Sequence, residues 1–408
     1  MNSGKIKTAK ACEHITLFSI YVIAFFLPIS KAIIESFSIL AIIAYLTKKF
    51  LNFENLPKTP ISYGIFAYLP ICVISVFFSS NPATSSNTFL RKTLQDIIFF
   101  FVVFETLNSK QKLRNIIYVL FLSSLLIGID GIYQYFTHKD FIRHRKDLAI
   151  PRIYASFPYP NAFGCYLSAV MPFVLTSVFA KYPAKILKFF SFCLFILLFT
   201  CLLLTVSRGA WFAFSASALF MSMWLRILGI FLLTIGIFII VALQFFHPYI
   251  KERLRNLFIF TDTSGMDRKI IWQAGWKMFI SKPWLGVGLG TFMFNFKNFV
   301  IKDYPHGAVY AHNCYLQMAA EIGVIGLAAF LLILALFFHS GIKTLNAKER
   351  SFSWYVLLAS QAAILGYCVQ MGVDTTLYSL DLGMLFWLVL GIGVAAMKNL
   401  QSACATRK

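Results

Sequence analysis

The stretch AHNCYLQMAAEIGVIGL, residues 311–327, decides the fold, because an apolar helix begins there directly after a long hydrophilic segment, residues 247–310. His312 stands at that boundary, and Asn313, Gln317 and Glu321 follow it at intervals of four. Four-residue spacing places these three polar side chains on one face of a helix. A polar stripe costs free energy inside a bilayer, so the pattern predicts a functional site where the helix meets water.

The composition around this stretch is that of a membrane protein. The 408-residue chain is 59% hydrophobic and 13% charged, with a mean hydropathy of +0.74. These values exclude a soluble domain and predict an all-α polytopic membrane protein. Apolar windows of about 20 residues predict about 12 transmembrane helices. They lie near residues 14–30, 32–47, 60–79, 93–107, 115–136, 159–180, 186–206, 208–225, 227–246, 312–338, 352–372 and 381–397.

These spans divide the chain into three parts. Residues 1–246 hold the first nine spans, 247–311 form a long loop, and 312–408 hold the last three spans and a tail. The first span is expected to be an uncleaved anchor, because PISK at 28–31 is not a small-residue cleavage site. Within the loop we expect an interfacial helix, N-capped by Asp267. One face of that helix would carry Arg268, Trp272, Trp276 and Phe279.

Membrane topology explains only some of the basic residues. The formal net charge is +21. Short lysine-rich loops on one face predict that this face is cytoplasmic and that both termini lie inside. The other face nevertheless carries many basic residues: Arg91, Lys92, Arg143, Arg145, Lys146, Arg152, Arg208 and the lysines and arginines of 251–302. Because guanidinium groups grip phosphate bidentately, these arginines predict convergence on an anionic group, with anionic lipid headgroups as the alternative partner.

Four stretches taken together carry a family resemblance. They are RIYASFPYPNAFGCYL (152–167), SRGAW (207–211), an R-x-x-x-W motif (268–272) followed by KPWLGVGLGTF (282–292), and residues 311–327. In this order the chain from about residue 150 onward resembles the bacterial O-antigen ligase and polymerase superfamily. The resemblance implies a GT-C-like glycosyltransferase of the inner membrane with a periplasmic active site.

The resemblance also implies the substrates. Members take a glycan from undecaprenyl diphosphate and pass it to a hydroxyl, without a nucleotide sugar, a metal or another cofactor. Ligases use lipid A–core as the acceptor, whereas polymerases extend the glycan itself. The expected partners are therefore the undecaprenyl-diphosphate-linked donor, the lipid A–core acceptor and the lipid bilayer, with no nucleic acid.

The resemblance places the family's histidine on His312 and two of its arginines on Arg208 and Arg268. Considered as residues alone, arginines near the membrane surface would stabilise a diphosphate leaving group, and Arg152 and Arg91 are further candidates. His312 is suited to accept a proton from the acceptor hydroxyl. Asn313, Gln317 and Glu321 are expected to support it, Glu321 as a buried hydrogen-bonding partner.

Each of these side chains also has a simpler interpretation. Arg208 could extend to lipid headgroups, and Arg268 could stack on Trp272. His312 could hydrogen-bond a sugar or a phosphate without moving a proton. Three acidic residues near the external ends of spans could form salt bridges with the arginines: Asp130, Asp374 and Asp381.

Other chemistries find little support in the sequence. The segment GVGLG (286–290) follows no predicted strand and precedes no GK[ST], so dinucleotide binding is not expected. Neither D-x-D nor H-E-x-x-H occurs, and the cysteines show no metal-ligand spacing, so we expect no metal site. A transporter of an anionic lipid-linked substrate is the alternative from another class of protein. The apolar midplanes of the spans and the one-sided arginines favour surface chemistry over transport.

Overall fold

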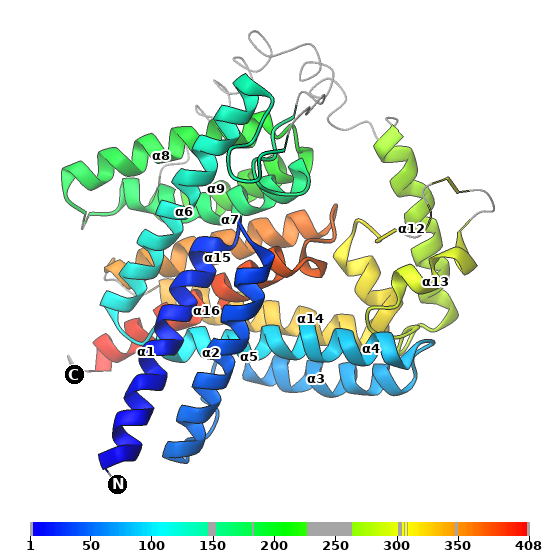
Figure 1. Ribbon diagram of the computed structural model, residues 1–408, viewed down its shortest axis with the longest axis horizontal. Coiled ribbons are helices and arrows are strands. Elements are labelled where there is room, and N and C mark those ends of the chain that lie inside the picture. The colour runs from blue at the N-terminus through cyan, green and yellow to red at the C-terminus, as the bar shows by residue number, and fades with distance from the viewer. Residues whose placement is uncertain are drawn as a thin grey trace.

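The computed structural model describes residues 3–145, 152–181, 183–226, 263–300, 304–305, 307, 309–346 and 350–405. Within that part of the chain every regular element is helical, as the sequence predicted (Figure 1). The predicted span 227–246 and the first part of the loop, 247–262, lie outside the described residues.

The helices follow one another along the chain with short connections between most of them. The first half contains α1 (Ser3–Phe26), α2 (Lys31–Asn52), α3 (Ser62–Phe77), α4 (Pro82–Thr88), the π-helical turn η1 (Phe89–Leu94), α5 (Gln95–Thr106), α6 (Lys110–Thr137), α7 (Pro160–Phe179), α8 (Lys185–Leu204) and α9 (Arg208–Leu225). The second half contains α12 (Thr263–Ser281), α13 (Phe292–Phe299), α14 (Cys314–Leu345), α15 (Phe352–Met371), the 3-10 turn η2 (Thr376–Tyr378) and α16 (Leu380–Ala405).

Seven of the described helices are long and apolar enough to cross a membrane: α1, α6, α7, α8, α14, α15 and α16. Each coincides with a predicted span. Four other predicted spans coincide with α2, α3, α5 and α9, which fall short in length or apolarity. The protein is therefore a multi-pass helical membrane protein, and the total of about 12 spans stays a prediction.

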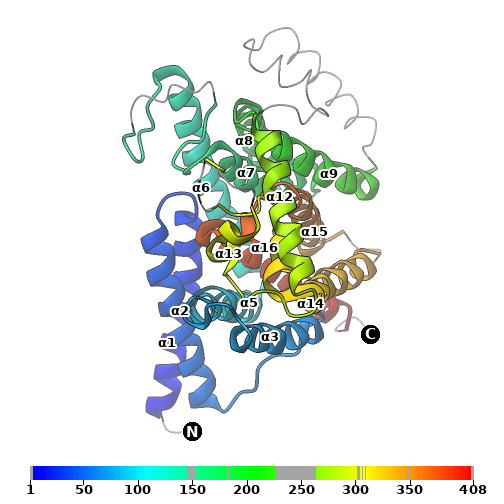
Figure 2. The ribbon, with the colours of Figure 1, turned by 90° about the vertical axis from the view of Figure 1, so that its right-hand side faces the viewer.

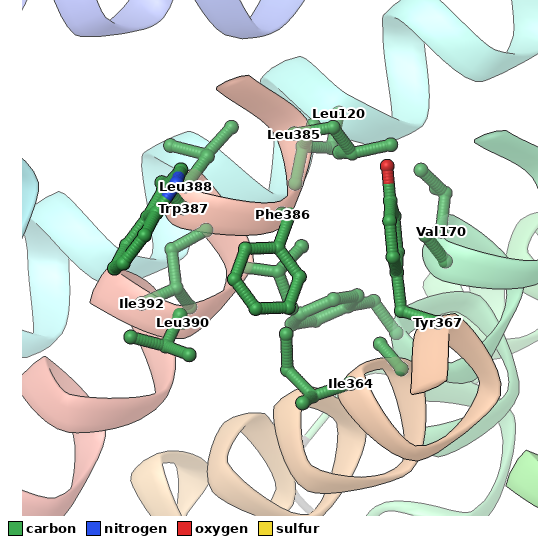
Figure 3. Close-up of a cluster of buried hydrophobic side chains, with 14 of the residues drawn as sticks. Leu120, Val170, Ile364, Tyr367, Leu385, Phe386, Trp387, Leu388, Leu390 and Ile392 are labelled. Atoms are coloured by element: carbon green, nitrogen blue, oxygen red, sulfur yellow. The ribbon is translucent and has the colours of Figure 1, made fainter. Parts of the chain in front are cut away.

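The core of the bundle forms where α15 packs against α7, α9 and α16. Figure 3 shows side chains that meet there from four helices: Leu120 of α6, Val170 of α7, Ile364 and Tyr367 of α15, and Phe386 of α16. All five are buried. Because lipid tails are as apolar as these side chains, close packing rather than exclusion of water holds such helices together.

The long helix α14 is interrupted at Gly323, whose backbone has φ +70. At about 1.5 Å per residue, its 32 residues would extend well beyond a hydrocarbon core of about 30 Å. A Cβ on Gly323 would collide with the carbonyl group of Trp284. At the break the Val324 amide donates to the Pro283 carbonyl over 2.8 Å, so the 282–292 loop provides a hydrogen-bond partner.

This break corrects the expectation of one continuous span over 312–338. Residues 324–345 alone are long enough to cross a bilayer. The polar stripe of Asn313, Gln317 and Glu321 lies before the break, where Glu321 accepts hydrogen bonds from the loop and from η2. A hydropathy window could not show this, because it registers apolar length and not the backbone angle of one glycine.

The helices α12 and α13 pack beside the first part of α14, at the end of the molecule away from both termini (Figures 1 and 2). The buried face of α12 carries Ile271, Ala274 and Met278. The expected cap at Asp267 is wrong, because the helix already begins at Thr263. The expected single face also divides: Trp272 is half-buried, whereas Trp276 is 55% exposed.

Candidate functional site

Three of the four arginines predicted to bind phosphate line one small cavity. Arg152 precedes α7, Arg208 is the first residue of α9, and Arg268 lies in the second turn of α12. The cavity has a volume of about 40 Å³. Three guanidinium groups from three separate elements make this cavity a place where an anionic group can be bound through charge-assisted hydrogen bonds.

A tight turn between α8 and α9 positions Arg208. Ser207 caps α9, its hydroxyl accepting from the Ala210 amide at 3.4 Å. The Trp211 indole donates back to the Leu202 carbonyl at 3.0 Å, which fixes the angle between the two helices. Arg208 therefore lies at a helix N-terminus, where the helix dipole also favours an anion.

The same turn holds Arg152. Its Nε donates to the Thr205 carbonyl at 2.8 Å, and its Nη2 donates to Asn161 Oδ1 at 3.1 Å. These two bonds set the plane of the guanidinium group. Arg152 and Arg208 are thus placed relative to each other by residues 205–208, although 56 positions separate them in the sequence.

Arg91 lies apart from this group. It belongs to η1, its side chain is exposed, and it is not among the residues that line the cavity. The neighbouring Lys92 donates to the Tyr378 carbonyl at 3.1 Å. The structure therefore brings together Arg152, Arg208 and Arg268 and leaves Arg91 outside.

His312 pairs with an acidic residue that follows α15. Its Nδ1 lies 3.3 Å from Oδ1 of Asp374, an oxygen that also accepts from the Thr375 amide at 2.8 Å. The Asp374 side chain is 2% exposed and the His312 side chain 42% exposed. A buried carboxylate thus orients the imidazole through Nδ1. In this geometry Nε2 is the nitrogen that remains for a substrate.

The backbone of His312 is held in an uncommon conformation, with φ +47. The residue before it is fixed on both sides: the Ala311 amide donates to Gln317 Oε1 at 3.1 Å, and its carbonyl accepts from the Trp272 indole at 3.0 Å. Asn313 caps α14 by accepting from the Leu316 amide. A non-glycine residue at positive φ is strained, and such strain persists only where the surroundings determine it.

Glu321 is buried and accepts four hydrogen bonds. The donors are the amides of Gly290 and Phe292, Nε2 of Gln317 and the hydroxyl of Tyr378, at 2.9 to 3.1 Å. This agrees with the expected buried hydrogen-bonding partner. Glu321 ties the 286–292 loop and η2 to α14, and through Gln317 it reaches the backbone next to His312.

The two halves of the site are neighbours along the chain. Val373 lines the arginine cavity, and the next residue, Asp374, holds His312. On α12, Arg268 lines the cavity while Trp272, one turn later, contacts the residue before His312. The structure thus places the arginine-lined cavity next to the residue that pairs with His312.

The nearby tyrosines stay neutral. Burial raises the pKa of Tyr159, and the carboxylates of Asp374 and Asp381 add to the effect. Burial also raises the pKa of Tyr310, with a contribution from Glu321. Neither phenol is therefore a base at neutral pH.

The pairing of His312 with Asp374 was not predicted from the sequence. Asp374 was identified only as an acidic residue at the external end of a span. The two positions are 62 apart in the sequence, and no local pattern connects them. The one indication in the sequence was the segment VDTTLYS (373–379), which is polar and lies between two apolar helices.

Fold and site together define a class: a multi-pass helical membrane protein with an arginine-lined cavity beside a histidine–aspartate pair. Residues 193–331 match the family model described as O-antigen ligase. That confirms the resemblance seen in the motifs. The matched segment contains Arg208, Arg268, His312 and Glu321.

Two relatives come from Rickettsia. A protein of Rickettsia typhi is 24% identical over 306 residues, which cover 71% of each chain, and one of Rickettsia prowazekii is 23% identical over 302 residues, which cover 70% of each. Both are named "putative polysaccharide ligase". These matches extend the similarity well beyond the segment of the family domain.

Proposed function

We propose that the protein is a glycosyltransferase that moves a glycan, an O-antigen, from undecaprenyl diphosphate to a hydroxyl of lipid A–core on the periplasmic side of the inner membrane. The observation that supports this is the arginine cavity next to the His312–Asp374 pair. Transfer from a glycosyl diphosphate needs a group that stabilises a polyanionic leaving group and a group that takes a proton from the acceptor. The site offers one of each.

In this proposal Arg152, Arg208 and Arg268 bind the diphosphate. The bond between the anomeric carbon and the phosphate oxygen breaks, and its electron pair goes to that oxygen. Negative charge on the diphosphate therefore grows in the transition state, where fixed guanidinium groups stabilise it. Three such groups supply the positive charge that a metal supplies in other transferases, so we propose a metal-independent reaction that persists in EDTA.

His312 acts as the base. As the acceptor oxygen forms its bond to the anomeric carbon, its proton passes to Nε2 of His312. Asp374 keeps the proton on Nδ1 and stabilises the imidazolium that forms. Asn313, Gln317 and Glu321 act indirectly, because their hydrogen bonds hold the backbone that presents His312.

The proposal is tested in cells that lack the protein, by separating their lipopolysaccharide on a gel. We expect rough core with the glycan left on undecaprenyl diphosphate. Wild type restores the ladder, whereas His312→Ala and Arg208→Ala at equal expression do not. Two exposed residues outside the site serve as matched controls, His339→Ala and Lys297→Ala, and both should restore it.

The same gel distinguishes the alternatives. Core capped with a single repeat unit would identify a polymerase of the same superfamily. An unchanged ladder in the deletion strain would contradict both transferase activities. The next experiment would then be transport of a lipid-linked substrate by the purified protein in liposomes.

A further inference from the structure

A second cavity lies on the other side of the segment that carries Asp374. Its polar wall comes from the run α4–η1–α5 and includes Thr88, Lys92, Thr93 and Asp96. Its remaining walls include Tyr378 and Trp387, and its volume is about 60 Å³. Neither His312 nor the arginines of the first cavity line it.

The backbone that builds the polar wall is unusual. Residues 89–94 form a π-helical turn between two α-helices. Such turns are rare, and they occur frequently at functional sites. Thr88, Lys92 and Asp96 follow one another at intervals of four, so the widened turn keeps them on the side that faces the cavity. The distortion thus aligns a hydroxyl, an ammonium and a carboxylate.

Lys92 and Asp96 define what the cavity can bind. Lys92 Nζ donates to the Tyr378 carbonyl and keeps further donors. No described residue donates a hydrogen bond to the Asp96 carboxyl group, which lines the cavity. A neutral group with several hydroxyls suits both side chains, because it accepts from Lys92 and donates to Asp96.

The volume of the cavity further restricts the kind of ligand that it can hold. A cavity of about 60 Å³ holds several water-sized groups, since one such group needs about 10–15 Å³ on this measure. The cavity therefore has room for hydroxyl groups on the edge of a sugar ring. The aromatic side chains of Tyr378 and Trp387 provide the flat apolar surface on which the remainder of a sugar can lie.

The position of the cavity matches that of a second substrate. Along 373–378, Val373 lines the arginine cavity, Asp374 holds His312, and Tyr378 lines the second cavity. The Tyr378 ring lies 6.0 Å from the ring of Tyr310, two residues before His312. Residues 373–378 therefore connect the arginine cavity, the partner of His312 and the second cavity within six positions of the chain.

We infer that this second cavity is the acceptor-sugar subsite, in which Asp96 and Lys92 hold hydroxyl groups of the acceptor sugar next to the one that reacts. This inference rests on the proposed transferase function. It assigns the recognition of the acceptor to the first half of the chain, outside the segment that matches the family model.

The test is steady-state kinetics of the purified full-length protein with undecaprenyl-diphosphate-linked glycan and with lipid A–core from cells that lack O-antigen. Asp96→Asn should raise KM for lipid A–core about 2- to 10-fold, the usual effect of weakening one hydrogen bond. KM for the donor and kcat should stay within about twofold. Thr93→Val, a substitution of similar volume, should raise the acceptor KM by about fivefold.

Glu105→Gln is the matched control, because Glu105 is another carboxylate of α5, pairs with Lys49 and does not line the cavity. Elution volume and thermal midpoint establish folding, and Thr93→Val decides the question if Asp96→Asn does not fold. An unchanged acceptor KM in the folded variants, or a rise in the donor KM, would overturn the subsite and leave the transferase function intact. Absence of transfer by the wild type would contradict the function and the subsite with it.

Discussion

Replacing Asp374 tests how the site orients and charges its base. In the proposed mechanism His312 becomes an imidazolium in the transition state, and its Nδ1 lies 3.3 Å from Oδ1 of Asp374. Two unit charges at this distance attract by about 5 kcal/mol at an effective dielectric constant of about 20, and by about 1 kcal/mol in water. Because the His312 side chain is 42% exposed, the lower part of this range applies, about 1–2 kcal/mol. We therefore expect Asp374→Asn to lower kcat roughly 5- to 30-fold.

The asparagine variant isolates the charge. The Thr375 amide donates to Oδ1, so in the variant the asparagine oxygen, not its nitrogen, should occupy that position. That oxygen can still accept from Nδ1 of His312. Asp374→Ala also removes this hydrogen bond, which costs about a further tenfold. Both variants should leave KM for donor and acceptor unchanged, because the imidazolium exists only in the transition state.

The assay measures transfer by purified protein with each substrate varied in turn. Asp381→Asn is the matched control: Asp381 is also a buried carboxylate near an external helix end, but its ion-pair partner is Lys31, at 3.8 Å. Folded Asp374 variants with wild-type kcat would refute the orienting role. A rise in the donor KM at constant kcat would show that Asp374 organises the arginines instead.

Three further predictions concern the surrounding structure. Arg208→Lys should lower kcat/KM for the donor about 10- to 100-fold, because an ammonium cannot grip phosphate bidentately; varying the donor concentration measures this. Gly323→Ala should lower the free energy of unfolding by more than about 3 kcal/mol, because the new Cβ would collide with the Trp284 carbonyl. Gly307→Ala is the comparison: Gly307 has a similar φ and no neighbour, so this change should cost about 1 kcal/mol. Thermal unfolding of both variants measures the difference. Glu321→Gln should lower the thermal midpoint and speed proteolysis of the 282–292 loop, because its amide group would face a hydrogen-bond donor.

The helices of this protein could be predicted because the length of each apolar segment can be read directly from the sequence. The spans 160–179 and 352–371 coincide with their predictions almost residue for residue. The predicted span 93–107 is the last part of a longer helical run from Pro82 to Thr106, which contains the π turn. A π turn depends on local backbone hydrogen bonding and on tertiary contacts, and hydropathy carries no record of either.

The arginine cavity could be anticipated, although not its membership. Arg152, Arg208 and Arg268 lie near the starts of helices on the face predicted to be outside, so topology gave reason to expect their convergence. Arg91 satisfied the same criterion and lies elsewhere, because the direction of a side chain around a helix end is set by packing. The sequence indicated which residues are charged and on which side of the membrane they lie, but not how far apart the arginines are.

The partner of His312 could not be predicted for a related reason. Asp374 becomes its partner because α14 and α15 bring residues 312 and 374 together at one end of the bundle. Contacts between distant segments depend on the order of helices in space, which a single sequence does not state.

The most direct test of the central claim is transfer by the purified protein with only undecaprenyl-diphosphate-linked glycan and lipid A–core present. Mass spectrometry follows both products. We expect glycan-bearing lipid A–core and free undecaprenyl diphosphate to form in equal amounts with the wild type, and neither to form with His312→Ala. Transfer by folded His312→Ala at the wild-type rate would contradict the assignment of the base, and absence of transfer by the wild type would contradict the function itself.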